Sequence, residues 1–253
     1  MKSLEFTLIT CTNISKSKSV PGSRFDEEYH VVMGLIVSGV HTERKLSMKL
    51  YISTGNKKLK SNDRVRFLIW NLPAVATCPF RTALCEKNCY ARKAEKQYPG
   101  CLPCRERNLE LSKQADFVPE MVKLIQRRQK HKAYRGKKIL FRIHESGDFY
   151  SWQYAERWLE IARQCPDVTF LAYTKSLPFF EGLSIPENFV IRASVWSDTK
   201  PELLDLSAKY PIYTALPKGT YDTVRNFQCK CEDCGTCQAC YSPKVKNIIV
   251  DIH

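Results

Sequence analysis

The sequence predicts an α/β protein whose core is an irregular or partial β/α barrel. Three observations predict it. Between residues 137 and 217, short apolar segments alternate with amphipathic segments of helical period. Each apolar segment ends in polar or glycine-containing residues. The chain has 253 residues and is 43% hydrophobic, which suffices for one sizeable core. Such alternation favours a parallel sheet with right-handed crossovers.

The first part of the chain, residues 1–63, is predicted to be β-rich and to pack on the core. Residues 28–40 and 45–54 have strand composition and are bounded by turn signals. Residues 64–73 (RVRFLIWNLP) are a short apolar segment typical of a buried strand, and cysteines follow it at once. Residues 105–129 then have a helical period, with an interruption expected near Pro119.

The regular alternation follows, and it completes a barrel region of residues 64–226. Its expected strands lie within residues 137–149, 168–176, 188–198 and 211–217, and its expected helices within residues 150–166 and 199–211. With the strand near residue 64, this gives five parallel strands. Polar groups at the C-terminal ends of such strands meet in one place. Residues 227–253 form a cysteine-rich tail, which we expect to close over the barrel mouth.

The composition points to an anionic partner. The chain carries 40 Lys and Arg against 26 Asp and Glu, a formal net charge of +14. The densest basic segment, Arg127–Lys138, is a possible nucleic-acid contact, although cations there also suit a helix dipole. No apolar run is long enough to cross a membrane, and the first residues lack the features of a signal peptide. We therefore expect a cytoplasmic protein.

Ten of the twelve cysteines fall into three groups. Thiols stay reduced in the cytoplasm, so grouped cysteines indicate metal ligands or reactive thiols. In chain order, the groups are Cys78, Cys85 and Cys89; Cys101 and Cys104; and Cys229, Cys231, Cys234, Cys237 and Cys240.

The last group contains a C-x2-C-x2-C pattern, which wraps three corners of an iron–sulfur cubane while the fourth ligand comes from elsewhere. The predicted ligands in the tail are Cys231, Cys234, Cys237 and Cys240. Zinc is the alternative, because C-x2-C pairs also form zinc knuckles. In that case Cys101 and Cys104 would pair with Cys234 and Cys237.

The first group, C-x6-C-x3-C, is predicted to be the working metal centre. Three thiolates on a [4Fe-4S] cluster leave one iron with an open position, where it acts as a Lewis acid. Cys78, Cys85 and Cys89 are the predicted ligands. The alternative is a closed cluster whose fourth ligand is Cys101, Cys104 or Cys240.

Polar residues at the strand ends are the candidate catalytic groups. His144, Glu145 and Asp148 follow one expected strand and are suited to acid–base work. Asp148 has an alternative role as the cap of the next helix. Lys175 follows another strand and offers a positive charge, with an ordinary surface lysine as the alternative.

Two arginines, Arg142 and Arg192, lie inside apolar strands and must be paired or face an internal polar site. We expect Arg192 to pair with Asp148 or Glu145.

The cysteines after the first barrel strand, with the later loop Glu145-Ser146-Gly147-Asp148, resemble the radical S-adenosylmethionine (SAM) superfamily. That superfamily uses C-x3-C-x2-C, whereas this chain has C-x6-C-x3-C. The resemblance implies a [4Fe-4S] cluster whose open iron binds SAM. It also implies that the 145–148 loop contacts the cofactor, which makes Ser146 and Gly147, with Arg192, the candidate cofactor-binding residues.

Residues 65–241 also resemble the gene product 88 family of phage proteins. The resemblance lies in the CP…C…CYA pattern from Cys78 to Ala91, in FRIHESGDF, in F-x-AYTK from Phe170 to Lys175, and in the cysteine run of the tail. It implies a phage or prophage origin and two metal-cluster motifs, and it supplies no reaction.

Together these features predict a phage-type iron–sulfur enzyme with one or two [4Fe-4S] clusters, in the cytoplasm of a phage-infected or prophage-carrying bacterium. Its reaction on an unknown small molecule would be radical SAM chemistry or Lewis-acid chemistry such as hydrolysis, with His144 or Glu145 moving protons and an electron donor as a further partner. The alternatives are an electron carrier and a non-catalytic, metal-stapled protein that binds nucleic acid through Arg127–Lys138.

Overall fold

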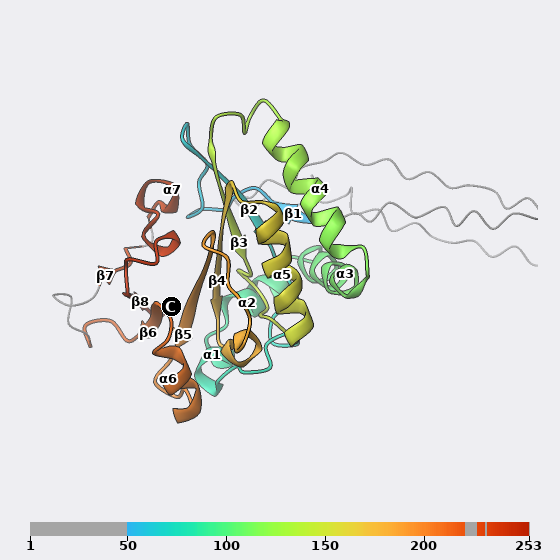
Figure 1. The fold of residues 1–253 in the computed structure, drawn as a ribbon. Helices are drawn as coiled ribbons and strands as arrows, with labels where there is room; N and C mark the ends of the chain where they lie inside the picture. The colour runs from blue at the N-terminus through green and yellow to red at the C-terminus, as the bar shows by residue number, and fades with distance from the viewer. Residues whose placement is uncertain (1–49, 221–226, 231, 253) are drawn as a thin grey trace, which may run out of the picture.

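A computed structural model describes residues 50–220, 227–230 and 232–252. The strand expected within residues 28–40 and the cysteine at position 231 lie outside these residues. The described residues form one sheet of eight strands in the order β1-β2-β3-β4-β5-β6-β8-β7 (Figure 1). The strands are β1 (Ile52–Ser53), β2 (Val65–Trp70), β3 (Lys138–Ile143), β4 (Val168–Thr174), β5 (Phe189–Val195), β6 (Ile212–Leu216), β7 (Phe227–Gln228) and β8 (Asn247–Asp251).

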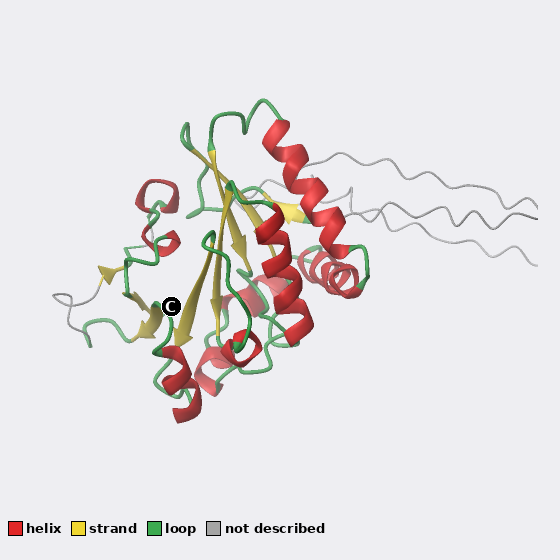
Figure 2. Ribbon diagram, in the orientation of Figure 1, coloured by secondary structure: helices red, strands yellow, loops and turns green. Residues whose placement is uncertain are grey.

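The five predicted parallel strands are confirmed, and they pair in chain order from β2 to β6. The short edge strand β1 is antiparallel to β2, whereas β8 is parallel to both β6 and β7. Figure 2 shows the arrowheads of β4 and β5 pointing to the same end of the sheet. Within the described residues β1 and β7 are the two edges, so the sheet is open and no closed barrel forms.

The helices that connect the parallel strands cover one face of the sheet. They are α3 (Cys101–Lys113), α4 (Phe117–Lys130), α5 (Trp152–Gln164), the 3-10 turn η2 (Leu177–Phe180) and α6 (Pro201–Ser207). In Figure 1, α4 and α5 lie on the side of the sheet away from α7 (Cys234–Cys237). The core on the helix side is aromatic: the Trp158 ring packs edge-on against Phe117 at 5.6 Å and Phe141 at 5.4 Å.

Helix boundaries differ from the sequence prediction in one place. The helical region 105–129 is broken between α3 and α4, at Gln114–Asp116, rather than near Pro119. Pro119 lies in the first turn of α4, where its missing N–H costs nothing because no hydrogen bond is formed there. Two short helices that were not predicted, α1 (Ala83–Lys87) and α2 (Tyr90–Gln97), occupy the segment with the first cysteines.

The cysteine-rich tail lies elsewhere than we predicted. We expected it at the C-terminal ends of the strands. Instead α7 and the 3-10 turn η3 (Ala239–Tyr241) cover the sheet face opposite the helices, here called the second face. Lys138, the first residue of β3, donates to the Gln238 side chain at 3.3 Å. The tail thus reaches the N-terminal end of β3.

Apolar side chains explain this position. The second face presents Phe67, Leu140, Leu171 and Val190, which are buried together with Tyr241 of the tail. Without the tail these side chains would be exposed to water, and their burial stabilises the fold by roughly 1.5–3 kcal/mol each. The tail also adds β8 to the sheet beside β6, so it is part of the core fold.

Candidate functional site

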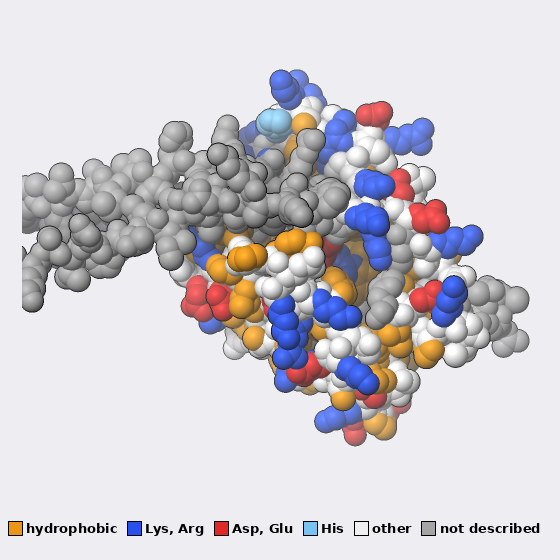
Figure 3. Space-filling view, turned by 180° about the vertical axis from the view of Figure 1, so that it is seen from behind, with side chains coloured by type: hydrophobic (Ala, Val, Ile, Leu, Met, Phe, Trp, Pro, Cys, Tyr) orange, Lys and Arg blue, Asp and Glu red, His pale blue; other side chains and the backbone are white. Residues whose placement is uncertain are grey.

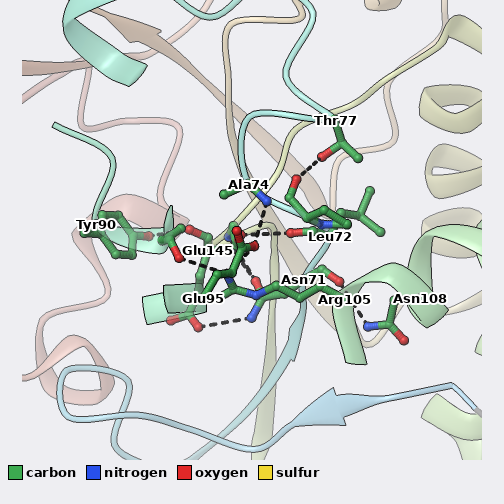
Figure 4. Close-up of polar contacts among 12 residues, drawn as sticks. Asn71, Leu72, Ala74, Thr77, Tyr90, Glu95, Arg105, Asn108 and Glu145 are labelled. Atoms are coloured by element: carbon green, nitrogen blue, oxygen red, sulfur yellow. Dashed lines mark hydrogen bonds and ion pairs between the residues drawn. The ribbon is translucent and has the colours of Figure 1, made fainter. Parts of the chain in front are cut away.

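The loops at the C-terminal ends of the strands meet around the first cysteines, as predicted. Asn71, just after β2, accepts hydrogen bonds through Oδ1 from the backbone N–H groups of Glu145 at 2.8 Å and Ser146 at 3.1 Å (Figure 4). This side chain therefore joins the end of β2 to the loop after β3. Asn71 was not among the predicted residues, and its only sequence signal is its place directly after an apolar strand.

Ser146 and Gly147 fasten the segment that leads to Cys78. The Ser146 hydroxyl donates to the Leu72 carbonyl at 2.8 Å, and the Leu72 N–H donates back to the Ser146 carbonyl at 3.0 Å. Gly147 has φ of +82°, and a Cβ there would lie 2.7 Å from the Leu72 Cβ and 2.5 Å from the Thr77 hydroxyl. The structure thus gives both residues a positioning role, and their contact with a cofactor stays a prediction.

A buried ion pair supports the same segment from outside. Arg105 of α3 and Glu95 of α2 are joined at 2.8 Å, with side chains only 11% and 9% exposed. The same Glu95 oxygen accepts the Ala74 N–H at 2.8 Å (Figure 4). Because breaking a buried pair leaves an uncompensated charge, this contact fixes α2 and α3 against the loop that leads to Cys78.

Asp148 is buried beside Cys78. Its carboxylate accepts hydrogen bonds from the Phe149 N–H at 2.8 Å, from the Lys175 N–H at 3.0 Å and from the Thr174 hydroxyl. Burial raises the pKa of Asp148 even though these hydrogen bonds oppose the shift. Asp148 is not the cap of α5, because the Ser151 hydroxyl caps this helix by accepting the Tyr154 N–H.

Lys175 is buried as well, which excludes the alternative of an ordinary surface lysine. It is 7% exposed, and its ammonium donates to the Ser194 hydroxyl at 2.9 Å. The Nζ atom also lies 5.6 Å from the centre of the Trp196 ring. The ends of β4 and β5 are thereby linked through one cation.

Asp198, which sequence reasoning missed, fixes the helix that carries Cys85. It accepts the Leu84 N–H at 2.7 Å, across more than a hundred residues of chain. Thr82 caps the same helix by accepting the Cys85 N–H at 3.2 Å. The available signal was the position of Asp198 at the polar end of the β5 segment.

The three cysteines of the first group lie on separate segments at the C-terminal end of the parallel strands. Cys78 is in the loop after β2, Cys85 is in α1, and Cys89 precedes α2. All three are partly exposed free thiols. Burial raises the pKa of Cys78 to about 12, and negative charge on Asp148, Cys85 and Cys89 adds to the shift. The thiols are therefore close enough to influence one another.

The three thiols do not form a site for a single ion. Among residues 50–220, 227–230 and 232–252, no three Cys, His, Asp or Glu side chains converge as ligands of one metal ion. The two cysteines of α3 belong to a different environment. Burial raises the pKa of Cys101, with Arg105 and Glu95 as the charges that act on it, and neither is a cysteine.

A basic hollow opens beside Cys89. It has a volume of about 590 Å³ and lies over α1 and α2. Its lining consists of Ala83, Glu86, Lys87, Cys89, Arg92, Lys93 and Lys96. Four cations against one carboxylate make this surface, next to a predicted metal ligand, suitable for an acidic molecule.

The tail cysteines lie over the second face. Asp233 caps α7 by accepting the Gly235 N–H at 2.8 Å, and the Cys234 N–H donates to the Lys58 carbonyl at 2.9 Å. A Cβ on Gly235 would lie 2.4 Å from the Lys60 carbonyl oxygen, so only glycine fits this close contact. Cys237 is exposed, whereas Cys234 and Cys240 are partly buried.

Arg192 binds this tail. The prediction that it pairs with Asp148 or Glu145 is wrong. Its guanidinium donates to four backbone carbonyls, at 2.7 to 3.0 Å. The acceptors are Ala239, Cys240, Ser242 and Val245. The tail has no acidic side chain at these positions. Its backbone carbonyls instead supply the hydrogen-bond acceptors that a fully buried cation requires.

His144 lies on the helix side of the sheet, in the aromatic core. Its Nε2 is 3.0 Å from the Tyr154 hydroxyl, and its ring centre is 4.8 Å from that of Phe149. Burial, with the charge of Arg142 adding to it, lowers the pKa of His144 to about 3. The ring is therefore neutral at physiological pH, and its predicted catalytic role has no support from this position.

Glu145, in contrast, is partly exposed on the second face. Its carboxylate accepts hydrogen bonds from the side-chain amides of Asn56 and, at 3.5 Å, Asn71. Its backbone carbonyl accepts the hydroxyl of Tyr90, the residue after Cys89 (Figure 4). Burial raises the pKa of Glu145, although Arg142 and the two amides oppose the shift.

The comparisons with known proteins agree with one of the two resemblances. Two relatives, each called Gene 88 protein, come from Mycobacterium phages L5 and D29 and are 39% and 37% identical over 109 and 106 residues. Each match covers 39% of this chain, and 43% and 42% of the relatives, so it spans less than half of their length. No solved structure matches the chain significantly.

None of these findings supports the distant resemblance to the radical SAM superfamily. Among the described residues, no helix has the length and apolar character needed to cross a membrane. The Gene product 88 family matches residues 45–243, most of the chain and nearly all of the strands described above. The chain therefore belongs to the Gene product 88 family.

Proposed function

We propose that this phage protein is an iron–sulfur enzyme whose working [4Fe-4S] cluster is held by Cys78, Cys85 and Cys89. One observation carries the proposal: folding brings three free thiols to the edge of the sheet where the loops after β2, β3, β4 and β5 meet. Structural metal sites are closed by four ligands, whereas working sites keep a position open. Three thiols at a converging edge fit the second description.

The donor set suits a cluster better than a single ion. Each thiolate of a cubane binds a different iron, so the sulfurs stand farther apart than the ligands of one ion. Such a spacing is compatible with Cys78, Cys85 and Cys89, which do not converge as the ligands of one ion. Three thiolates beside the Asp148 carboxylate would repel one another, and a cationic cluster would relieve this repulsion.

When bound, such a cluster supplies one iron with an open position for Lewis-acid or electron-transfer chemistry. The residues around it have separate roles. Glu145, partly exposed and with a raised pKa, is the candidate to hold or release a proton. Asp148 and Lys175 fix the loops after β3 and β4 beside Cys78. The carboxylate of Glu145 replaces the buried imidazole of His144 in the proton-transfer role.

The basic hollow beside Cys89 supports an acidic electron donor as partner. Lys87, Lys93 and Lys96 line it, and they are placed to attract a negatively charged protein. The segment Arg127–Lys138 is a weaker candidate for binding. It joins the last turn of α4 to the start of β3, at the opposite end of the sheet from the first cysteine group. Figure 3 shows Lys and Arg side chains at the top of the molecule, over this region.

The direct test is metal analysis of anaerobically purified protein. We would measure iron, acid-labile sulfide and zinc in the wild type and in a triple variant with Cys78→Ser, Cys85→Ser and Cys89→Ser. The matched controls are Cys165→Ala, which removes a lone core thiol, and the double variant Cys101→Ser with Cys104→Ser. We expect the triple variant alone to lose about four irons and the matching sulfide.

Other outcomes would decide between the alternatives. Zinc without sulfide would overturn the iron–sulfur proposal. Iron loss in the Cys101/Cys104 variant would show a closed cluster with a ligand from α3. A change in the EPR spectrum of the reduced protein on adding SAM would identify that molecule as the ligand of the open iron, and its absence would favour Lewis-acid chemistry.

A further inference from the structure

Arg142 and Arg192 occupy the same face of the sheet but are satisfied in different ways. Arg192, on β5, donates hydrogen bonds from its guanidinium to four backbone carbonyls of the tail. Arg142, on β3, makes one hydrogen bond, from Nε to the His144 carbonyl at 3.3 Å. His144 has φ of +63°, and this left-handed turn at the end of β3 directs the carbonyl back toward Arg142.

The two terminal nitrogens of Arg142 have no hydrogen-bond partner in the part of the chain that the structure describes. Neither nitrogen is fully buried, and Arg142 as a whole is partly exposed. A guanidinium has five N–H donors in a fixed fork, and most of the donors of Arg142 have no partner among the described residues.

No carboxylate of the described residues forms an ion pair with this cation, although the charges of Glu145 and Arg142 act on each other. Glu145 is the neighbouring acid, but its oxygens accept hydrogen bonds from Asn56 and Asn71, and burial raises its pKa. The Arg142 guanidinium instead lies over the ring of Tyr173, with Cζ 3.6 Å from the ring centre. Stacking of this kind holds the guanidinium plane in place and leaves its edge free.

Aromatic residues that neighbour both cysteine groups lie near this fork. Tyr90, which follows Cys89, is bonded to the Glu145 carbonyl, and Tyr173 lies against Cys240 of the tail. A second cation, Lys175, lies two residues beyond Tyr173 and is bonded to Ser194 on β5. The Arg142 cation and the phenols of Tyr90 and Tyr173 make an environment for an anion rich in oxygen.

We propose that Arg142 binds a carboxylate or phosphate group of a small-molecule ligand. The bidentate fork matches the two oxygens of either group, and charge-assisted hydrogen bonds of this kind are about twice as strong as neutral ones. That the ligand is the substrate rests on the proposed function. Held there, it would lie on the second face beside Glu145, at the strand ends next to the first cysteine group.

Chemical protection tests this on the wild-type protein. Phenylglyoxal modifies accessible arginines, and mass spectrometry reports each site. We expect inorganic phosphate or acetate, added at constant ionic strength, to slow modification of Arg142 at least about tenfold, as an occupied fork requires. Arg163, exposed on α5 beside Glu160, is the matched control and should not be protected. Phosphate and acetate in separate arms show which anion fits better.

Binding measurements on variants give the second arm. By calorimetry with the same anions, Arg142→Gln should weaken binding at least about tenfold, Arg142→Lys should retain part of it, and Arg163→Gln should leave it unchanged. Equal modification of Arg142 with and without both anions would overturn the proposal, whether or not the variants fold. Iron is measured on the same samples: a chain without iron that still protects Arg142 would end the cluster proposal and keep the anion site.

Discussion

At the scale of single residues, His144 shows how far a side chain's role depends on which face of the sheet it takes. It follows an apolar strand and precedes two acids, which is the sequence signature of a catalytic group. Its ring nevertheless packs between Phe149 and Tyr154 on the helix side, while Glu145, one residue later, lies on the second face. Neighbouring residues on opposite faces of the sheet therefore differ in role: His144 is a core residue, and Glu145 is a candidate acid.

The buried imidazole should make stability depend on pH. The pKa of His144 falls from 6.5 to about 3 on folding, so between these values the unfolded chain binds a proton that the folded chain does not. Stability from this group is complete above pH 6.5 and is lost as the pH falls toward 3, with a slope of at most about 1.4 kcal/mol per pH unit. Urea unfolding of wild type and His144→Asn across this range checks it, and parallel pH profiles would contradict it.

Gly147 gives a steric prediction with an internal control. Ala at Gly147 must adopt a left-handed φ and also meets Leu72 and Thr77, whereas Ala at Gly136, with φ of +71°, meets nothing within 4 Å. Both variants pay the backbone cost of about 1–2 kcal/mol, and overpacking adds about 1–3 kcal/mol at Gly147 alone. Thermal unfolding should therefore rank Gly147→Ala below Gly136→Ala, and equal losses would contradict the close packing.

At the scale of elements, the strands followed from the sequence while the short helices and the tail did not. Apolar segments such as VRFLIW and FVIRASV are long and uniform enough to indicate strands. Helix α2, YARKAEKQ, is short and has few apolar residues, and α1 has only five residues. The position of the tail depends on contacts of Arg192 across 47 to 53 residues, which no local pattern contains.

The attachment of the tail through Arg192 is testable. Arg192→Met would leave four tail carbonyls without their donor, and we expect it to reduce stability by more than about 3 kcal/mol. Backbone amides of residues 239–245 should then exchange hydrogen faster, while those of β3 and β4 keep their protection. Arg163→Met on the surface of α5 is the matched control. Unchanged exchange in the tail of the Arg192 variant would show that the apolar contacts under Tyr241 suffice to hold it.

At the scale of the whole molecule, the two faces of the sheet are covered by different parts of the chain. Helices cover one face, and the tail covers the N-terminal part of the other. Strands β2 to β6 follow one another without a reversal of order, so their loops share one edge, and the first cysteines lie there. The sequence predicted this edge and its polar residues. It did not predict that the tail cysteines lie over the second face, because the face that a segment covers is determined only on folding.

The central claim is that Cys78, Cys85 and Cys89 hold an iron–sulfur cluster at this edge. Anomalous diffraction at the iron edge, from crystals grown without oxygen, tests it most directly. We predict a strong iron peak bounded by these three sulfurs beside Asp148, with one side of the cluster facing away from any cysteine. Iron found only at the tail, a peak at the zinc edge instead, or a fourth cysteine closing the cluster would contradict the account.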